Sequence, residues 1–219
     1  MTPRMIYQVP ETRERILGIA KDIFVAQGFF SVTMTDIADA AGISRTSLYR
    51  YFQDKLDLGL AVSRELLREI PAASPDYVAS VRETTPDGLS EVERWIELMW
   101  VTPDGDDIET FFAEFDSYFS GERLPEDFVE RWSEILDELP SLADSFAGAV
   151  ARGIADGTVR PDVDAMTTVA SVTNAMRGLN HRLLLRNEAL VEMQGIENQA
   201  VLETMKDVIV RGLKADETT

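Results

Sequence analysis

The sequence contains no cysteine and a single histidine, His181. Without cysteine the chain can form neither a disulfide bond nor a thiolate metal site, and one histidine excludes a histidine-rich metal site within one chain. No stretch of about twenty apolar residues occurs, so no membrane span is predicted and a membrane is not an expected partner. The N-terminal residues, MTPRMIYQVPETRER, lack the apolar core of a signal peptide. These absences predict a cytoplasmic protein that needs no metal and no cofactor.

Motifs of catalysis are also missing. The chain has no glycine-rich phosphate-binding loop and no G-x-S-x-G nucleophile elbow. Acidic residues are plentiful, but none has a distinctive spacing, and runs of acidic residues are usually solvated faces. We therefore predict no catalytic residue. An enzyme is the less favoured interpretation, which a screen detecting turnover would revive.

Charge is unevenly distributed along the chain of 219 residues, whose net charge is -18. Residues 1–55 hold seven basic and six acidic side chains, a net charge of +1, and the remainder holds 14 basic and 33 acidic, a net charge of -19. An acidic body would be repelled by DNA and would disfavour lying along it sideways. The alternative, of at least equal weight, is that the acidity serves solubility alone. Only the N-terminal part has a charge balance that suits a nucleic acid.

The stretch from Thr33 to Lys55 has the pattern of two short helices joined by a tight turn. Thr33 and Asp36 have the spacing of a capping box at the start of the first helix. Gly42 ends that helix, because glycine adopts a left-handed backbone conformation without steric cost. Ser44 is a favourable N-cap for the second helix.

The second of these helices has an apolar inner side and a polar outer side. Leu48 and Phe52 are four residues apart and share the buried side. The outer side presents polar and basic residues, namely Arg45, Thr46, Ser47 and Arg50. A short helix of this kind fits the major groove of DNA. The alternative is a helical hairpin without a role in DNA binding.

The run GFFSVTMTDIADAAGISRTSLYRYFQDK resembles the DNA-binding domain of the TetR family of bacterial transcriptional regulators. The positions that carry the resemblance are Gly28-Phe29, Thr33, Ile37-Ala38, Ala41-Gly42-Ile43-Ser44, Leu48-Tyr49, Phe52 and Lys55. The resemblance implies an all-α fold with a three-helix, helix-turn-helix DNA-binding domain in residues 1–55. It also implies a larger helical domain in residues 56–219 that binds an effector and dimerises. A helix starting at Lys55 would link the two domains.

The resemblance further implies that the second helix of the motif enters the major groove of double-stranded DNA. Positions matching Thr33, Tyr49 and Lys55 contact phosphate in the family, whereas the outer side of the second helix faces the bases. Taken singly, each of these residues has the alternative of a solvated surface side chain. The DNA-binding residues expected are Thr33, Ser44, Arg45, Thr46, Ser47, Tyr49, Arg50 and Lys55.

Apolar periodicity predicts helices throughout the chain and no strand. Proline and glycine divide these helices from one another. The expected ranges are 12–27, 55–70, 77–84, 89–101, 108–119, a helix with Pro125 in its first turn, 142–154, a helix capped by Asp162 or Asp164 that runs to about Asn187, and 196–213.

Aromatic residues are dense between Trp95 and Trp132. The resembled family holds an effector pocket among helices of the C-terminal domain, and a pocket needs apolar walls with few polar groups. For any single residue, the alternative is ordinary hydrophobic core, and the polar residues would equally face solvent or a dimer seam. The candidate effector-binding residues are Trp95, Met99, Trp100, Phe111, Phe115, Phe119, Trp132, Met176, Asn180 and His181.

The last two predicted helices have wide apolar faces with small residues interleaved. In the resembled family such helices pack against their copies as a four-helix bundle, and a helix-turn-helix protein needs two half-sites for useful affinity. The alternative is that both faces are used within the monomer. The candidate dimerisation residues are Met166, Val169, Thr173, Met176, Val201, Met205, Val208 and Ile209.

Together these features predict a DNA-binding transcriptional regulator. We expect a repressor that binds a palindromic operator as a homodimer and is released by an unknown small-molecule effector. The alternative is a helical adaptor whose helix-turn-helix has degenerated. Absence of binding to any DNA pool at low salt would favour that alternative.

Overall fold

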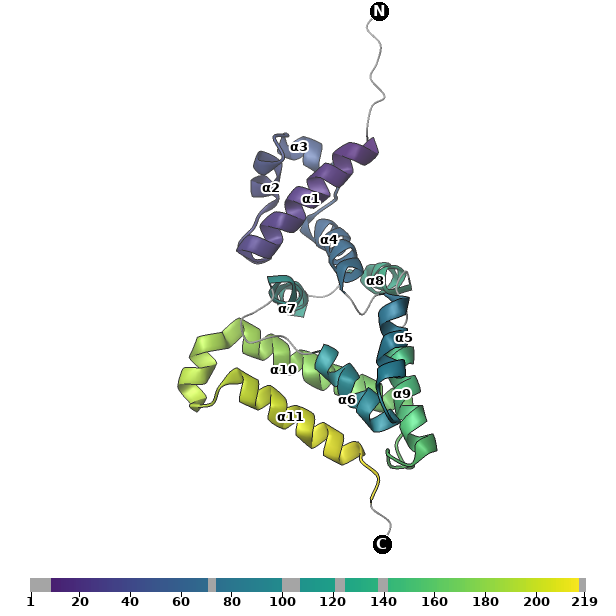
Figure 1. Ribbon diagram of the computed structural model, residues 1–219. Helices are drawn as coiled ribbons and strands as arrows, with labels where there is room; N and C mark the ends of the chain where they lie inside the picture. The colour runs from purple at the N-terminus through teal and green to yellow at the C-terminus, as the bar shows by residue number, and fades with distance from the viewer. Residues whose placement is uncertain (1–8, 71–73, 100–106, 121–124, 138–141, 217–219) are drawn as a thin grey trace, which may run out of the picture.

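The computed structural model describes residues 9–70, 74–99, 107–120, 125–137 and 142–216, which are helical and contain no strand (Figure 1). Their one strand-like pairing is an isolated antiparallel bridge between Val159 and Lys214. The predicted all-α fold is therefore confirmed. The helices are α1 (Val9–Gln27), α2 (Met34–Ala40), α3 (Arg45–Leu48), α4 (Lys55–Glu69), α5 (Pro75–Thr84), α6 (Gly88–Leu98), α7 (Asp107–Ser120), α8 (Phe128–Asp137), α9 (Leu142–Asp156), α10 (Ala165–Gln194) and α11 (Asn198–Leu213).

Local capping signals define the helix-turn-helix formed by α2 and α3. The Thr33 hydroxyl accepts a hydrogen bond from the Asp36 backbone N at 3.3 Å, and the Asp36 carboxylate accepts one from the Thr33 backbone N at 2.8 Å. The pKa of Asp36 lies below its ordinary value because its carboxylate accepts hydrogen bonds from the Thr33 hydroxyl, at 2.6 Å, and from the Thr33 backbone N. Gly42 has a φ of 66°, and the Ser44 hydroxyl accepts from the Ser47 backbone N at 3.1 Å. The caps and the turn thus form where the sequence predicts them.

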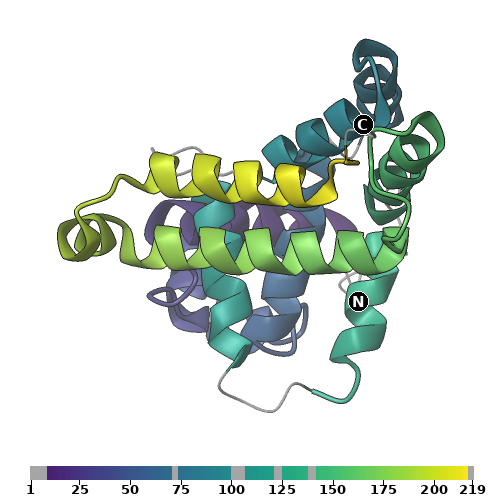
Figure 2. The same ribbon diagram turned by 90° about the horizontal axis from the view of Figure 1, so that it is seen from below.

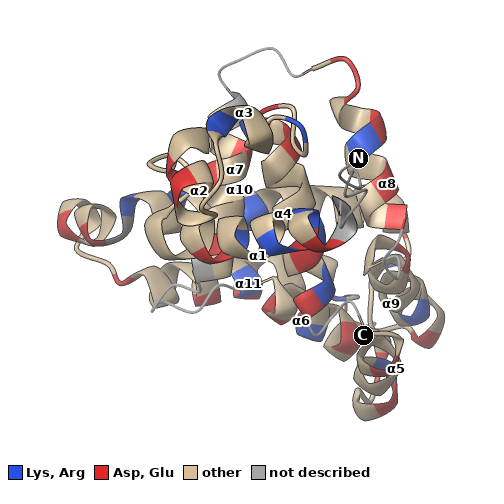
Figure 3. Cartoon of the chain, turned by 90° about the horizontal axis from the view of Figure 1, so that it is seen from above, with Lys and Arg blue, Asp and Glu red and all other residues tan. Residues whose placement is uncertain are grey.

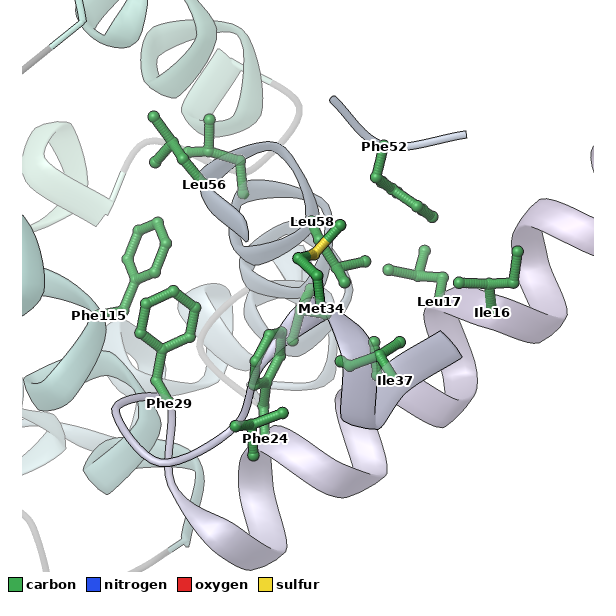
Figure 4. Close-up of a cluster of buried hydrophobic side chains, with 14 of the residues drawn as sticks. Ile16, Leu17, Phe24, Phe29, Met34, Ile37, Phe52, Leu56, Leu58 and Phe115 are labelled. Atoms are coloured by element: carbon green, nitrogen blue, oxygen red, sulfur yellow. The ribbon is translucent and has the colours of Figure 1, made fainter. Parts of the chain in front are cut away.

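The hydrophobic core around this motif, here called the N-terminal core, extends beyond the first three helices (Figure 4). A three-helix unit of this size buries little apolar surface alone, and the core is completed by α4, α7 and α8. Gly59 of α4 permits the approach of α7, since a Cβ there would lie 2.5 Å from the Phe115 ring. The members of the N-terminal core include Ile16, Phe24, Phe29, Ile37, Leu48, Phe52, Leu58, Leu66, Phe111, Phe115 and Ile135.

A second cluster, here called the body core, joins α5, α6, α9, α10 and α11. Helices α10 and α11 lie side by side at the end of the molecule opposite α2 and α3 (Figure 1). The body core includes Val81, Val92, Trp95, Ile96, Phe146, Val150, Val159, Val172, Met176, Leu183, Leu190, Leu202 and Leu213. The packing therefore has two centres. Helix α7 comes from the C-terminal part of the chain, yet its Phe111 and Phe115 are buried in the N-terminal core.

Several helix ends differ from the sequence-based ranges. Helix α10 runs to Gln194 rather than to about Asn187, because no glycine or proline intervenes before Gly195, which ends it with a φ of 67°. Helix α1 begins at Val9, before the expected Thr12. Helix α5 begins at Pro75, which fits a first helical turn. Helix α6 ends at Leu98, and residues 100 and 101 of the range predicted for it lie outside the described residues.

Candidate DNA-binding and effector sites

Helix α3 lies on the outside of the N-terminal unit. Leu48 is fully buried beneath it, so the opposite side of the helix is open. The exposed side chains at and after this helix are Ser44, Arg45, Thr46, Tyr49 and Arg50, while Ser47 is half-buried. Seen from above, the molecule carries basic positions on α1, α3 and α4, among acidic ones (Figure 3). Of the predicted base-reading residues, Arg45, Thr46 and Arg50 are therefore accessible, whereas Ser47 is only partly so.

The regular part of α3 is shorter than the pattern suggests. After Leu48 the backbone tightens, and Tyr51 N bonds to Leu48 O at 2.9 Å in a three-residue turn. Phe52 N also bonds to Leu48 O, at 3.1 Å, and the Phe52 side chain is fully buried in the N-terminal core. Tyr49 and Arg50 therefore lie in the turn that follows α3, and both side chains are exposed.

Arg45 and Tyr49 interact with one another in the structure. The Arg45 guanidinium donates to the Tyr49 hydroxyl at 3.2 Å and lies 5.5 Å from the centre of its ring. Such a contact between a cation and an aromatic ring is weak at an exposed site. The contact links two side chains that are both exposed on the N-terminal unit.

Lys55 lies at the start of α4, half-buried between aromatic rings. Its ammonium group is 4.4 Å from the centre of the Phe29 ring and 4.9 Å from that of Tyr118, and it donates to Phe30 O at 3.5 Å. Burial lowers the pKa of Lys55 below its ordinary value, and the nearby Glu114 carboxylate acts in the opposite direction. A contact with DNA phosphate would require the side chain to leave these rings.

The structure adds residues that the sequence pattern did not indicate. Glu114 of α7 accepts a hydrogen bond from the Phe30 backbone N at 3.0 Å, and it lies against Gly28. Arg15 of α1 donates to the last carbonyl of the α2 turn, Ala41 O, at 2.9 Å. Neither contact could be inferred from the sequence, because the partners are far apart along the chain. Glu114 and Phe30 are 84 positions apart, and Arg15 and Ala41 are 26 positions apart.

The candidate effector residues divide between the two cores. Phe111, Phe115 and Trp132 lie with the N-terminal core. Trp95, Met99 and Met176 lie with the body core. The structure therefore does not bring the aromatic group together around one site. Trp100 lies outside the described residues, and so does the side chain of Phe119, whose backbone is in α7.

Two polar candidates connect α10 to its neighbours. The Asn180 amide is 5% exposed and donates to Met99 O, at the end of α6, at 2.5 Å. The His181 Nδ1 lies 3.6 Å from the Asp116 carboxylate of α7. Burial lowers the pKa of His181, while Asp116 raises it and Arg177 lowers it further. The half-buried histidine thus sits where α10 meets the helix that carries Glu114.

The candidate dimerisation residues also have two different environments. Val169 is 4% exposed and Met176 is fully buried, so both side chains pack inside the protomer rather than on an outward face. The apolar stripe on which these two residues were chosen is the inner side of α10. Met166 is 53% exposed and Val208 is 61% exposed. Thr173, Val201, Met205 and Ile209 are half-buried.

A surface cavity of about 710 Å³ lies where the α9–α10 loop meets the end of α11. It is lined by Ile154, Gly157, Val159, Arg160, Pro161, Asp162, Arg211, Gly212, Lys214, Ala215 and Asp216. Arg160 is bonded to Asp162, and Arg211 to Asp207. None of the candidate effector residues lines this cavity, and its polar, internally paired walls do not suit an apolar ligand.

Two further classes of site are absent from the described ranges. No helix there combines the length and the apolar composition needed to cross a membrane. Within the same residues, no group of three or more histidine, cysteine, aspartate or glutamate side chains is arranged to hold a metal ion.

An exposed, capped second helix carried by a small helical unit, next to a larger helical body, is the arrangement of a helix-turn-helix module. Residues 16–62 match the family model for bacterial regulatory proteins of the tetR family. The chain is 27% identical to the transcriptional repressor KstR2 of Rhodococcus jostii over 158 residues, which are 69% of this chain and 70% of that protein. It is 34% identical to the transcriptional activator FasR of Mycolicibacterium smegmatis over 93 residues, 41% of this chain and 39% of that protein.

Solved structures share the fold over nearly the whole length. A candidate transcriptional regulator from Saccharomonospora viridis, solved in complex with choline, superposes with a TM-score of 0.65 at 22% identity, covering 93% of this chain and 98% of that one. Over residues 16–62 this chain is thus similar to the DNA-binding part of the TetR family of bacterial transcriptional regulators. The likeness of the body to solved structures is one of fold. The relatives named here are regulators, not enzymes.

Proposed function

We propose that the protein is a dimeric transcriptional repressor that binds a palindromic operator through α3 and is released by a small-molecule effector. The observation that carries this proposal is the exposed polar surface of α3, with its intact Ser44 cap, above a fully buried Leu48. The repressor activity of KstR2, a relative along most of the chain, supports repression over activation. Selection of bound fragments from random DNA tests the proposal, and it should return two inverted half-sites.

The outward sides of α10 and α11 support a dimer. The two helices lie next to one another in both views, and in Figure 2 no other helix covers them. Small residues lie on this exposed side, namely Ala170, Ser171, Asn174 and Gly178 on α10 and Ala200, Thr204 and Gly212 on α11. A Cβ added to Gly178 or Gly212 would meet nothing within 4 Å in the protomer. Small residues allow helices of two subunits to approach closely, and a two-fold dimer suits a palindromic site.

Helix α7 offers a route from effector to DNA. It touches the N-terminal unit through Glu114 and Phe115, and it faces α10 through Asp116 and His181. An effector that favours a different position of α7 would shift α1 and α4, and with them the distance between the two α3 helices of the dimer. The effector can shift the balance between the two conformers of the protein only by as much as its own affinities for them differ.

Replacing Arg50 or Arg45 with alanine should reduce sequence discrimination. If each arginine bonds to a base edge, its loss should cost about 1–3 kcal/mol per base contact and flatten the preference at that operator position. Fluorescence anisotropy on the operator and on single-base variants measures this. Arg82→Ala, an exposed arginine of α5, is the matched control and should change nothing. An equal loss of affinity for operator and scrambled DNA would assign the arginine to phosphate instead.

Replacing Lys55 with alanine should weaken binding to every DNA sequence alike. Loss of one phosphate contact lowers the magnitude of the slope of log affinity against log salt by about one unit. A dimer loses two such contacts, so the magnitude of its slope should fall by about two units. A salt titration on operator and scrambled DNA measures the slope. The control is Lys21→Ala, whose ammonium is paired with Glu69 of α4 at 2.5 Å. An unchanged slope in Lys55→Ala would show that the ammonium stays over Phe29 and Tyr118 in the complex.

The alternative of a helical adaptor with a degenerate motif has less support. The capping box, the turn glycine and the N-cap of α3 all keep their geometry. A protein that no longer bound DNA would retain Leu48 for its core but would have no need of an accessible Arg45 and Arg50. Failure to bind any DNA pool at low salt would favour the adaptor.

A further inference from the structure

The ammonium group of Lys55 lies in a contact that joins two distant parts of the chain. It is 4.4 Å from the centre of the Phe29 ring, which belongs to the turn after α1, and 4.9 Å from that of Tyr118, which belongs to α7. It also donates to the Phe30 carbonyl at 3.5 Å. The two rings and this carbonyl are here called the Lys55 cage. Because Tyr118 is the part of the cage that α7 supplies, the position of α7 determines whether the cage is complete.

One side of α7 is turned toward the cage. Glu114 and Tyr118 are four residues apart, so they share a side of the helix. The Glu114 carboxylate accepts a hydrogen bond from the Phe30 backbone N at 3.0 Å, and its negative charge attracts the Lys55 ammonium. The Tyr118 ring meets the Phe29 ring edge-on, with the two centres 5.3 Å apart. Helix α7 therefore contacts both the turn after α1 and the ammonium at the start of α4.

The cage stabilises a lysine ammonium only weakly. Aromatic rings and a carbonyl oxygen at 3.5 Å attract a cation less strongly than an anionic oxygen does. Burial lowers the pKa of Lys55 below its ordinary value, although the charge of Glu114 acts in the opposite direction. Lys55 is also the first residue of α4, where the helix dipole disfavours a cation and favours an anion. A DNA phosphate at this end of α4 would therefore be a stronger partner for the ammonium than the cage is.

We propose that the Lys55 cage competes with DNA for the Lys55 ammonium. In the free protein the ammonium lies over Phe29 and Tyr118, and on DNA it leaves these rings for a phosphate group. This inference rests on the proposed function, since it requires DNA binding. Coupling between binding events is reciprocal, so a change in α7 that strengthens the contact of Tyr118 with Lys55 weakens DNA binding, and removal of the Tyr118 ring strengthens it. Through this contact, the C-terminal part of the chain lowers DNA affinity.

Nuclear magnetic resonance measures the environment of Lys55 directly. The lysines of the chain are Lys21, Lys55, Lys206 and Lys214, so the full chain with isotope-labelled lysine gives a simple spectrum, and Lys55→Met assigns the signal. In the free protein, the two rings should shift the ε-methylene protons of Lys55 upfield. Addition of a random-sequence DNA duplex at low salt should return them to the position of an exposed lysine, because a phosphate contact needs no particular sequence. An upfield shift that persists on DNA, or that is absent from the free protein, overturns the proposal.

Substitutions at Tyr118 measure how far the cage lowers DNA affinity. Tyr118 is 39% exposed, so Tyr118→Leu removes the ring and keeps an apolar side chain. Loss of one weak ring contact should raise the affinity for the random duplex about twofold per subunit, and hence about fivefold for a dimer, as measured by fluorescence anisotropy. Tyr118→Phe keeps the ring and should leave the affinity unchanged. The matched control on the same helix is Phe112→Leu, whose ring packs on Phe111, and it should also change nothing.

A double-mutant cycle separates the cage from other effects of Tyr118. In the Lys55→Met background, Tyr118→Leu should not change DNA affinity, because the ammonium for which the cage competes is gone. An equal increase in both backgrounds, or no increase in either, contradicts the proposal. If circular dichroism shows that Tyr118→Leu does not fold, the Lys55 signal of the unsubstituted protein decides. A protein that binds DNA with Lys55 still over its rings retains the proposed function and loses only this inference, whereas one that binds no DNA loses both.

Discussion

Arginine substitutions on the outward side of α10 and α11 are expected to separate the proposed dimer and to remove the proposed operator binding. Ala170 and Ala200 are exposed in the protomer, so Ala170→Arg and Ala200→Arg should not disturb its core. At a close helix contact between subunits, the same side chains bring bulk and unpaired charge that the interface cannot accommodate. A monomer retains a single half-site, and its affinity should fall by about 10³-fold or more, toward non-specific binding.

Sedimentation velocity at micromolar concentration measures the oligomeric state, and anisotropy on the operator measures affinity. Ala79→Arg, on the exposed side of α5, is the matched control and should remain dimeric with full affinity. Met176→Arg provides a contrast, because its side chain is fully buried in the protomer and the variant should unfold rather than dissociate. A dimeric, operator-binding Ala170→Arg or a monomeric wild-type protein would contradict the α10–α11 dimer.

Replacing Gly88 with alanine is expected to be among the most destabilising single changes in the body. A Cβ on Gly88 would lie 2.0 Å from the backbone N of Gly153 and 2.3 Å from its Cα. The obstructing atoms are backbone, so α6 and α9 must move apart. The same contact is reinforced by the buried Glu91 carboxylate, which accepts from Arg152 at 2.8 Å. Overpacking usually costs about 1–3 kcal/mol, and a backbone clash should fall at or above the upper end of that range.

Urea denaturation at neutral pH measures the free energy of unfolding for this variant. Gly148→Ala on α9 is the matched control, because its Cβ would meet nothing within 4 Å. Alanine is a better helix former than glycine, so this control should be more stable by about 0.5–1 kcal/mol. Opposite signs for the two Gly→Ala changes would confirm the close crossing of α6 and α9. If the two variants changed the free energy of unfolding equally, α6 and α9 would be able to move apart at Gly88 without loss of stability.

Local features of the DNA-binding motif could be predicted because each depends on residues close in sequence. The Thr33 capping box, the left-handed Gly42 and the Ser44 cap all involve partners no more than four positions away. The inward placement of Leu48 and Phe52 follows from helical spacing in the same way. The length of α10 was underestimated, because sequence offers no stop signal between Asn187 and Gly195 and the end is decided by the glycine.

Partners distant in sequence could not be predicted. The density of aromatic residues in the sequence suggests that Phe115 and Trp95 belong to one group. In the structure, Phe115 packs against Phe29, whereas Trp95 lies in the body core. Apolar periodicity placed Val169 and Met176 on the dimer face, since a pattern shows that a helix has an apolar side but not what covers it. The exposed residues of α10 and α11 include small ones, such as Ala170 and Gly212, as well as the large apolar Met166 and Val208.

By itself, the sequence determined the all-α class, the helix-turn-helix with its caps, and the accessible residues of α3, because hydrogen bonds between near neighbours and helical periodicity specify them. Only the tertiary structure decided that α7 completes the N-terminal core, that Lys55 lies over Phe29 and Tyr118, and that the Asn180 amide of α10 bonds to Met99 O at the end of α6. These arrangements depend on which helix faces which. That choice is made by the combined packing of side chains far apart in the chain, where small residues such as Gly59 and Gly88 permit contacts that no local pattern encodes.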